Sequence, residues 1–66
     1  MNIIRHLRLS KKLSIAQLSE LSSITIANIS IFENEKRIPS LLSIYKLASA
    51  LGVEPSVIGD YYGIKL

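Results

Sequence analysis

The sequence predicts a compact all-α domain built from five short helices. Apolar residues recur at three- and four-residue intervals through most of the chain, as they do along one face of a helix. No segment alternates apolar and polar residues in the manner of a half-buried strand. The chain has 66 residues, 48% of them apolar. This size and composition predict a single domain, residues 1–66, with its core in residues 3–59.

The N-terminal segment predicts the first helix. Asn2 is suited to precede it, because a short polar side chain accepts hydrogen bonds from the free N–H groups of a first turn. Ile4 and Leu7 then follow at helical spacing. Lys11 and Lys12 lie where this helix would end, and their positive charge suits the negative end of a helix dipole.

A second helix of about two turns is predicted next. Ser14 followed by Gln17 has the S-x-x-Q pattern of a capping box, in which two side chains satisfy the free N–H groups reciprocally. Leu18 provides an apolar position on this helix, and the pair Ser22 and Ser23 ends it.

Thr25 is suited to begin a third helix, which is predicted to end near Glu33 or Asn34. The connection from the second helix is so short that the two helices must cross steeply. Four apolar side chains are predicted to fill the inside of the crossing: Leu18, Ile24, Ile29 and Phe32. This arrangement is a helix-turn-helix, whose second helix can project into a DNA major groove about 12 Å wide.

The fourth helix follows Pro39, which disfavours helical geometry at the residue before it, and Ser40 is suited to begin the helix. Gly52 is suited to end it. Five residues form its predicted apolar stripe: Leu41, Ile44, Leu47, Ala48 and Leu51.

Pro55 suits the first turn of a fifth helix. Val57 and Ile58 are predicted to face inward, and Gly59 is predicted only to weaken this helix. Residues 60–66 form a short apolar tail, in which Tyr61, Tyr62 and Ile64 are candidates for a dimer contact because tyrosine is enriched at interfaces.

Composition limits the classes of function. A net charge of +3 permits a nucleic-acid partner, and a chain without cysteine has no disulfide. The N-terminus lacks the pattern of a secretory signal, and the longest uncharged run, residues 21–32, is too short and polar to span a bilayer. We therefore expect a soluble, cytoplasmic protein without a membrane partner.

Nothing in the sequence indicates catalysis. His6 is the single histidine, and no residues stand near it at metal-ligand spacing. The serines lack a histidine arranged to activate a nucleophile, and Glu54 and Asp60 show no pairing for acid–base chemistry. We expect a protein that is not an enzyme and has no metal, cofactor or small-molecule ligand.

Four segments stand in one ungapped order over residues 4–58 and together resemble a known family. They are "IRHLR" from Ile4, "LSIAQL" from Leu13, "IFENEKRIPS" from Ile31 and "LASALGVEPSVI" from Leu47. The combination resembles the Cro/C1-type (Xre-like, lambda-repressor-like) helix-turn-helix DNA-binding domains. The resemblance implies a lambda-repressor-like fold and a transcriptional regulator that binds double-stranded DNA.

Four positions depart from the usual pattern of this family. Ile15 replaces a glutamine that commonly binds a phosphate, and Ser19 replaces an alanine. Ser23 and Glu35 stand where glycine is common. A positive φ at Ser23 would cost on the order of 1 kcal/mol in a residue other than glycine.

The resemblance also implies roles for individual residues. The positions implied to read bases are Thr25, Ile26, Ala27, Asn28, Ser30 and Ile31. The positions implied to contact phosphates are Ser14, Asn34, Lys36 and Arg37. Arg8 and Glu33 match an internal ion pair that holds the reading helix at its angle.

The face expected to meet DNA is unusually apolar. Asn28 can pair bidentately with adenine, and Ile26, Ala27 and Ile31 can pack on thymine methyl groups. The same apolar residues also fit a protein partner or a buried position. The main hypothesis is a sequence-specific repressor that binds a palindromic operator as a homodimer. The alternative is a protein-interaction module, of the antitoxin or inhibitor type, with the same fold.

Overall fold

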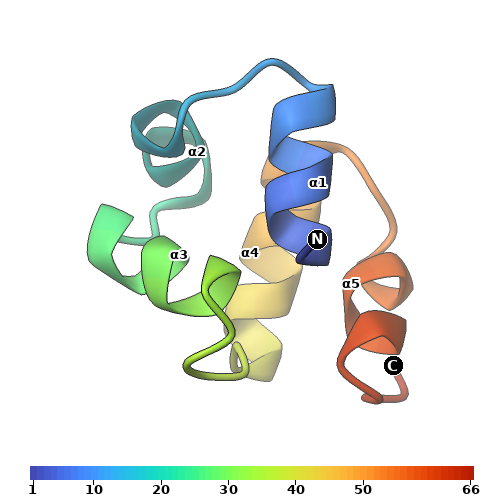
Figure 1. Ribbon diagram of the computed structural model, residues 1–66. Helices are drawn as coiled ribbons and strands as arrows, with labels where there is room; N and C mark the ends of the chain where they lie inside the picture. Colours follow the sequence, from blue (N-terminus) through green and yellow to red (C-terminus); the bar gives the residue numbers. More distant parts are fainter.

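The computed structural model describes residues 1–66 and contains five α-helices and no strand. The helices are α1 (Ile3–Ser10), α2 (Ile15–Ser22), α3 (Ile26–Glu33), α4 (Leu41–Leu51) and α5 (Pro55–Tyr61). In Figure 1, α2 and α3 lie on one side of α1 and α4, and α5 lies on the other. The predicted all-α, five-helix class is confirmed.

The first four helices begin at the residues that the sequence predicts. The residue that precedes each of these helices accepts, with its side chain, a hydrogen bond from a backbone N–H of the first turn. These capping residues are Asn2, Ser14, Thr25 and Ser40. The capping box of α2 is complete: Ser14 Oγ accepts from the N–H of Gln17 at 3.0 Å, and Gln17 Oε1 accepts from the N–H of Ser14 at 2.8 Å. Gly52 ends α4 with φ +69°.

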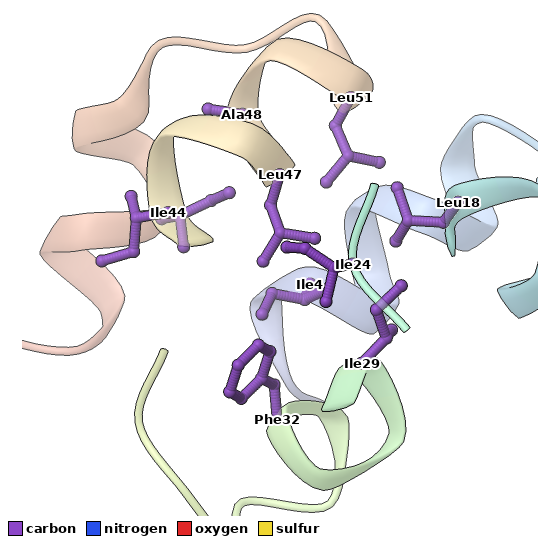
Figure 2. Close-up of a cluster of buried hydrophobic side chains, with 10 residues drawn as sticks. Ile4, Leu18, Ile24, Ile29, Phe32, Ile44, Leu47, Ala48 and Leu51 are labelled. Atoms are coloured by element: carbon purple, nitrogen blue, oxygen red, sulfur yellow. The ribbon is translucent and has the colours of Figure 1, made fainter. Parts of the chain in front are cut away.

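One apolar core joins the five helices. Helix α4 packs against α1, α2 and α5, so it lies in the middle of the fold. Figure 2 shows side chains from several helices converging on one cluster. The ten buried members are Ile4, Leu18, Ile24, Ile29, Phe32, Ile44, Leu47, Ala48, Leu51 and Ile58. The four side chains predicted to brace the helix crossing all belong to this core.

Two predicted inward residues are exposed instead. Leu41, the first residue of α4, is 52% exposed, whereas Ile44, about one turn further along the helix, is fully buried. Val57 is 40% exposed, whereas its neighbour Ile58 is fully buried. Consecutive helical residues point about 100° apart, so a helix that buries Ile58 turns the adjacent Val57 toward solvent.

Gly59 allows the C-terminal tail to return across α5, a role that goes beyond the predicted weakening of the helix. A Cβ atom at this position would lie 2.8 Å from Leu66 Cδ1 and 2.9 Å from the carbonyl oxygen of Ile64. Ile64 donates its N–H to the carbonyl oxygen of Gly59 at 2.9 Å. The tail therefore packs on the domain only because this residue has no side chain.

No single helix is long and apolar enough to cross a membrane. The pair α2 and α3 has the combined length and composition of a span, but it is bent by 114°.

Candidate nucleic-acid interface

Helices α2 and α3 meet at an angle of 114° across a connection of three residues, Ser23 to Thr25. Leu18 of α2 and Ile29 of α3 both belong to the core and are fully buried. The steep crossing turns the other side of α3 away from the protein. This geometry is the one by which a helix-turn-helix presents its second helix to a major groove.

The turn before α3 is held by serines that are close in sequence. Ser23 has the left-handed conformation, with φ +60° and ψ +26°, at the position where the family commonly has glycine. Ser19 Oγ donates to the carbonyl oxygen of Ile24 at 2.6 Å, and Ser22 Oγ accepts from the N–H of Ile24 at 3.3 Å. These bonds satisfy both polar groups of a buried turn residue and thus fix the direction in which α3 starts.

The opposite end of α3 is tied to α1 by a buried ion pair. Arg8 Nε donates to Glu33 Oε2 at 2.8 Å, and Nη2 donates to Oε1 at 3.0 Å. Arg8 Nη1 also donates to the carbonyl oxygen of Leu13 at 2.9 Å. The hydrogen bond with Glu33 raises the pKa of the Arg8 guanidinium, against the opposing effect of burial. The bidentate pair restrains the angle of α3.

Glu33 is the one charged residue of α3, and it is buried in this pair. The outer side of α3 is therefore electrically neutral. Ile26 is 47% exposed, and Ala27 and Asn28 are exposed beside it. The side chain of Asn28 has no hydrogen-bond partner within the chain, so its carboxamide is available to an external ligand.

The other implied base-reading residues are less available. Ile31 is partly buried, next to buried Phe32, and so lies between the outward and the buried position that the sequence left open. Thr25 Oγ1 accepts from the N–H of Asn28 at 3.1 Å as the cap of α3. Ser30 is partly buried, and its Oγ accepts from Asn34 Nδ2 at 3.2 Å.

The residues implied to contact phosphates also differ in how free their side chains are to bind an external group. Lys36 and Arg37 are exposed and form no ion pair within the chain. Asn34 is exposed, but its Nδ2 also donates to the carbonyl oxygen of Ser30 at 2.8 Å. Ser14 Oγ already accepts a hydrogen bond from the backbone of α2. Its hydroxyl proton stays available, since a hydroxyl donates as well as accepts.

Gln17 is a further candidate for a phosphate contact, and it was not predicted from the sequence. Its Oε1 accepts from the N–H of Ser14, which fixes the carboxamide at the exposed start of α2. Its Nε2 group has no partner and can donate to an anion beside the free N–H groups of the helix. The S-x-x-Q pattern could have predicted this contact, because a capping carboxamide accepts a hydrogen bond with its oxygen and leaves its nitrogen free to donate.

The tyrosines of the tail contact their own chain. Tyr61 donates its hydroxyl to Glu35 Oε2 at 2.5 Å, and Asn2 Nδ2 donates to the Tyr62 hydroxyl at 3.0 Å. The two rings pack edge to face with centroids 4.8 Å apart. Ile64 is partly buried against the core. These contacts lie within one chain, and the dimer contact stays a prediction.

The pKa of each of these two tyrosines is raised above that of an ordinary tyrosine. The hydrogen bond to Glu35 is the largest cause that raises the pKa of Tyr61. Burial is the largest cause that raises the pKa of Tyr62, and the hydrogen bond from Asn2 opposes it. No group of three His, Asp or Glu side chains is arranged to hold a metal ion.

A family model described as helix-turn-helix matches residues 4–58. The chain belongs to the Cro/C1-type helix-turn-helix family. Proteins of this helix-turn-helix family bind double-stranded DNA, and this chain is in general terms a DNA-binding regulator. No curated protein and no solved structure matches it. The match contains every residue implied to contact DNA, whereas Asn2 and the tail tyrosines lie outside it.

Proposed function

We propose that the protein is a sequence-specific repressor that binds a palindromic operator as a homodimer. The observation that carries this proposal is the exposed start of α3, where Asn28 has an unpaired carboxamide next to Ile26 and Ala27. A carboxamide pairs bidentately with adenine, and aliphatic side chains pack on the methyl group of thymine. An operator read this way is rich in A·T pairs at the centre of each half-site.

Phosphate contacts would position α3 on the duplex from both sides. The start of α2 offers free N–H groups with the Ser14 hydroxyl and the Gln17 amide, and the loop after α3 offers Lys36 and Arg37. Such contacts add affinity without sequence information. Each neutralised phosphate contributes about −0.9 to the slope of log affinity against log salt.

A homodimer would place two copies of α3 about 34 Å apart, in successive major grooves. Association also suits a domain of this size, because a small core alone gives little stability. A bound dimer would repress by covering the operator. Sedimentation with and without a selected duplex measures the stoichiometry, and one protomer per operator would contradict the homodimer.

Duplexes selected from a random library test the proposal directly. Asn28→Ala should relax the preference at one position of each half-site, at a cost of about 1–3 kcal/mol for the preferred base. Lys36→Ala should weaken binding to all duplexes and reduce the salt slope by about one per protomer. Ser49→Ala and Lys46→Ala, both on the exposed side of α4, are the matched controls.

Unchanged preference in Asn28→Ala together with an unchanged salt slope in Lys36→Ala would contradict the assignment of these two residues. Wild-type protein that shows no salt-dependent binding to any duplex would contradict the proposal as a whole.

One observation favours a second function, that of a protein-interaction module. The outer side of α3 carries no charge, and the side chain of Ile26 is half exposed among small neighbours. An uncharged helix face is suited to a hydrophobic groove of another protein. Under this alternative, Ile26→Asp abolishes partner binding, whereas Lys36→Ala leaves it unchanged; DNA binding requires a loss in both variants.

A further inference from the structure

Glu35 is an unusual residue to precede the basic pair Lys36 and Arg37. Its backbone has φ +60°, a left-handed conformation that strains any residue other than glycine. Its negative charge stands one residue away from the side chains proposed to contact phosphates. A carboxylate free to turn toward the duplex would repel it.

The carboxylate is not free. Glu35 Oε1 accepts from Asn2 Nδ2 at 2.8 Å, and Oε2 accepts from the Tyr61 hydroxyl at 2.5 Å. The same Asn2 Nδ2 lies 3.1 Å from the carbonyl oxygen of Phe32 and 3.0 Å from the Tyr62 hydroxyl. We call the group of Asn2, Glu35, Tyr61 and Tyr62 the clasp. It joins the start of α1, the end of α3 and the end of α5.

The backbone of this loop depends on the conformation that the clasp holds. Glu35 donates its N–H to the carbonyl oxygen of Phe32 at 3.1 Å, and Lys36 donates to that of Ile31 at 3.0 Å. This pair of hydrogen bonds at the end of a helix requires the left-handed conformation at the first donor, which is Glu35. Glycine adopts that conformation freely, whereas glutamate needs other contacts to hold it.

We propose that the clasp is a positioning device for the DNA-contacting loop. It holds the Glu35 carboxylate toward the chain termini, away from the phosphates, and fixes the backbone so that Lys36 and Arg37 point to the duplex. Asn2 and Tyr61 are therefore positioning residues that act on DNA through Glu35. This inference rests on the proposed function.

Tyr61→Phe is the sharpest test, because it removes one hydroxyl and keeps the ring. Affinity for a labelled pool of random-sequence duplexes should fall about three- to tenfold, the effect of one hydrogen bond. The backbone amides of Glu35 and Lys36 should exchange with solvent faster in the absence of DNA. Tyr45→Phe on α4 is the matched control, since the Tyr45 hydroxyl has no hydrogen-bond partner.

A second variant separates positioning from simple packing of the tail. Glu35→Gly removes the carboxylate and adopts φ +60° without strain, so the loop no longer needs the Tyr61 hydroxyl. When it is made in Glu35→Gly, Tyr61→Phe should therefore change duplex affinity by less than about twofold. If Tyr61 only anchored the tail, Tyr61→Phe would weaken binding by the same factor in Glu35→Gly as in the wild type.

Two results would overturn the proposal: wild-type affinity and amide exchange in Tyr61→Phe, or an equal loss of affinity from Tyr61→Phe in the wild type and in Glu35→Gly. Failure of the proposed function is seen separately, as wild-type protein that binds no duplex. In that case, solvent exchange of the Glu35 and Lys36 backbone amides still tests whether the clasp holds the loop. Faster exchange in Tyr61→Phe would support its hold on the loop, and unchanged exchange would refute it.

Discussion

The two ends of α3 solve the same problem in different ways. Each end is next to a residue other than glycine with φ +60°, Ser23 before the helix and Glu35 after it. Before the helix, the turn is held by Ser19 and Ser22, whose partner Ile24 is five and two residues away. After the helix, the partners of the end are remote in sequence. Asn2 and Tyr61 are 33 and 26 residues from Glu35.

This difference separates a local device from a global one. The turn before α3 contains its own hydrogen-bond partners, so it can form whenever α2 and α3 form. The side-chain contacts that hold Glu35 after α3 form only when α1 and α5 are packed beside the loop. We therefore expect substitutions at the C-terminal end of α3, the second end, to affect the stability of the whole domain. Substitutions at its N-terminal end, the first end, should have smaller effects.

The largest effect is expected from the ion pair at the second end. Glu33→Gln leaves the buried Arg8 guanidinium without its counter-charge and should reduce the free energy of unfolding by about 3–5 kcal/mol. Urea denaturation followed by circular dichroism measures this change. Glu20→Gln, an exposed carboxylate on α2 without an ion pair, is the control and should change stability by less than about 0.5 kcal/mol.

An equal effect of Glu33→Gln and Glu20→Gln would mean that the buried ion pair at the end of α3 does not stabilise the domain.

Substitution of Asn2 and Thr25 compares the two ends of α3 more directly, because Asn2 contacts its C-terminal end and Thr25 caps its N-terminal end. Asn2→Ala removes the cap of α1 and the bonds from Asn2 Nδ2 to the end of α3, so it should cost about 2 kcal/mol. Thr25→Ala removes a cap with a single local bond and should cost about 1 kcal/mol. Thermal unfolding of both variants under one condition measures the order, and a larger loss in Thr25→Ala would reverse it.

Glycine substitution at the two left-handed residues sharpens the comparison. Ser23→Gly relieves strain at a residue whose side chain makes no hydrogen bond, and should stabilise the protein by about 0.5–1 kcal/mol. Glu35→Gly relieves the same strain but loses two hydrogen bonds, so its net gain should be smaller. Urea midpoints of the two variants give the answer. A greater gain at Glu35 would show that the clasp contributes no stability.

The smallest effect is expected from alkaline pH. The folded state raises the pKa of Tyr61 and Tyr62 above that of the unfolded chain, so it holds these protons more tightly. Their contribution to stability is fully present below about pH 10 and is lost as pH rises through the folded-state values. In Tyr61→Phe/Tyr62→Phe, urea midpoints should fall less steeply above pH 10 than in the wild type, whereas Tyr45→Phe should follow the wild type. Identical pH profiles would contradict the shifts.

The local features of the fold could be predicted from the sequence because their causes are neighbours in the chain. The caps at Ser14 and Thr25 and, apart from Leu41, the buried face of α4 follow from residue type and spacing, whereas the positive φ at Ser23 was implied by the family resemblance. The family resemblance also gave the partner of Arg8, which spacing alone could not.

The remaining features depend on contacts between segments that only the folded chain brings together. The tail returns because Gly59 admits Leu66, and the sequence showed that glycine only as a weak helix former. The Asn2 side chain was expected to accept hydrogen bonds as a cap, but its nitrogen also reaches α3 and α5. The free nitrogen of Gln17 was missed because the capping pattern explained that residue without it.

The burial of Glu33 with Arg8 leaves the outer side of α3 without an ionisable group. Under the proposed function, discrimination between operators then belongs to one part of the molecule, and the ion-dependent strength of binding to another. A shift in cellular ion concentration would change how many operators are occupied while the ranking among them stays the same. Substitutions at Ile26 or Ala27 could likewise change the preferred operator without altering the response to salt.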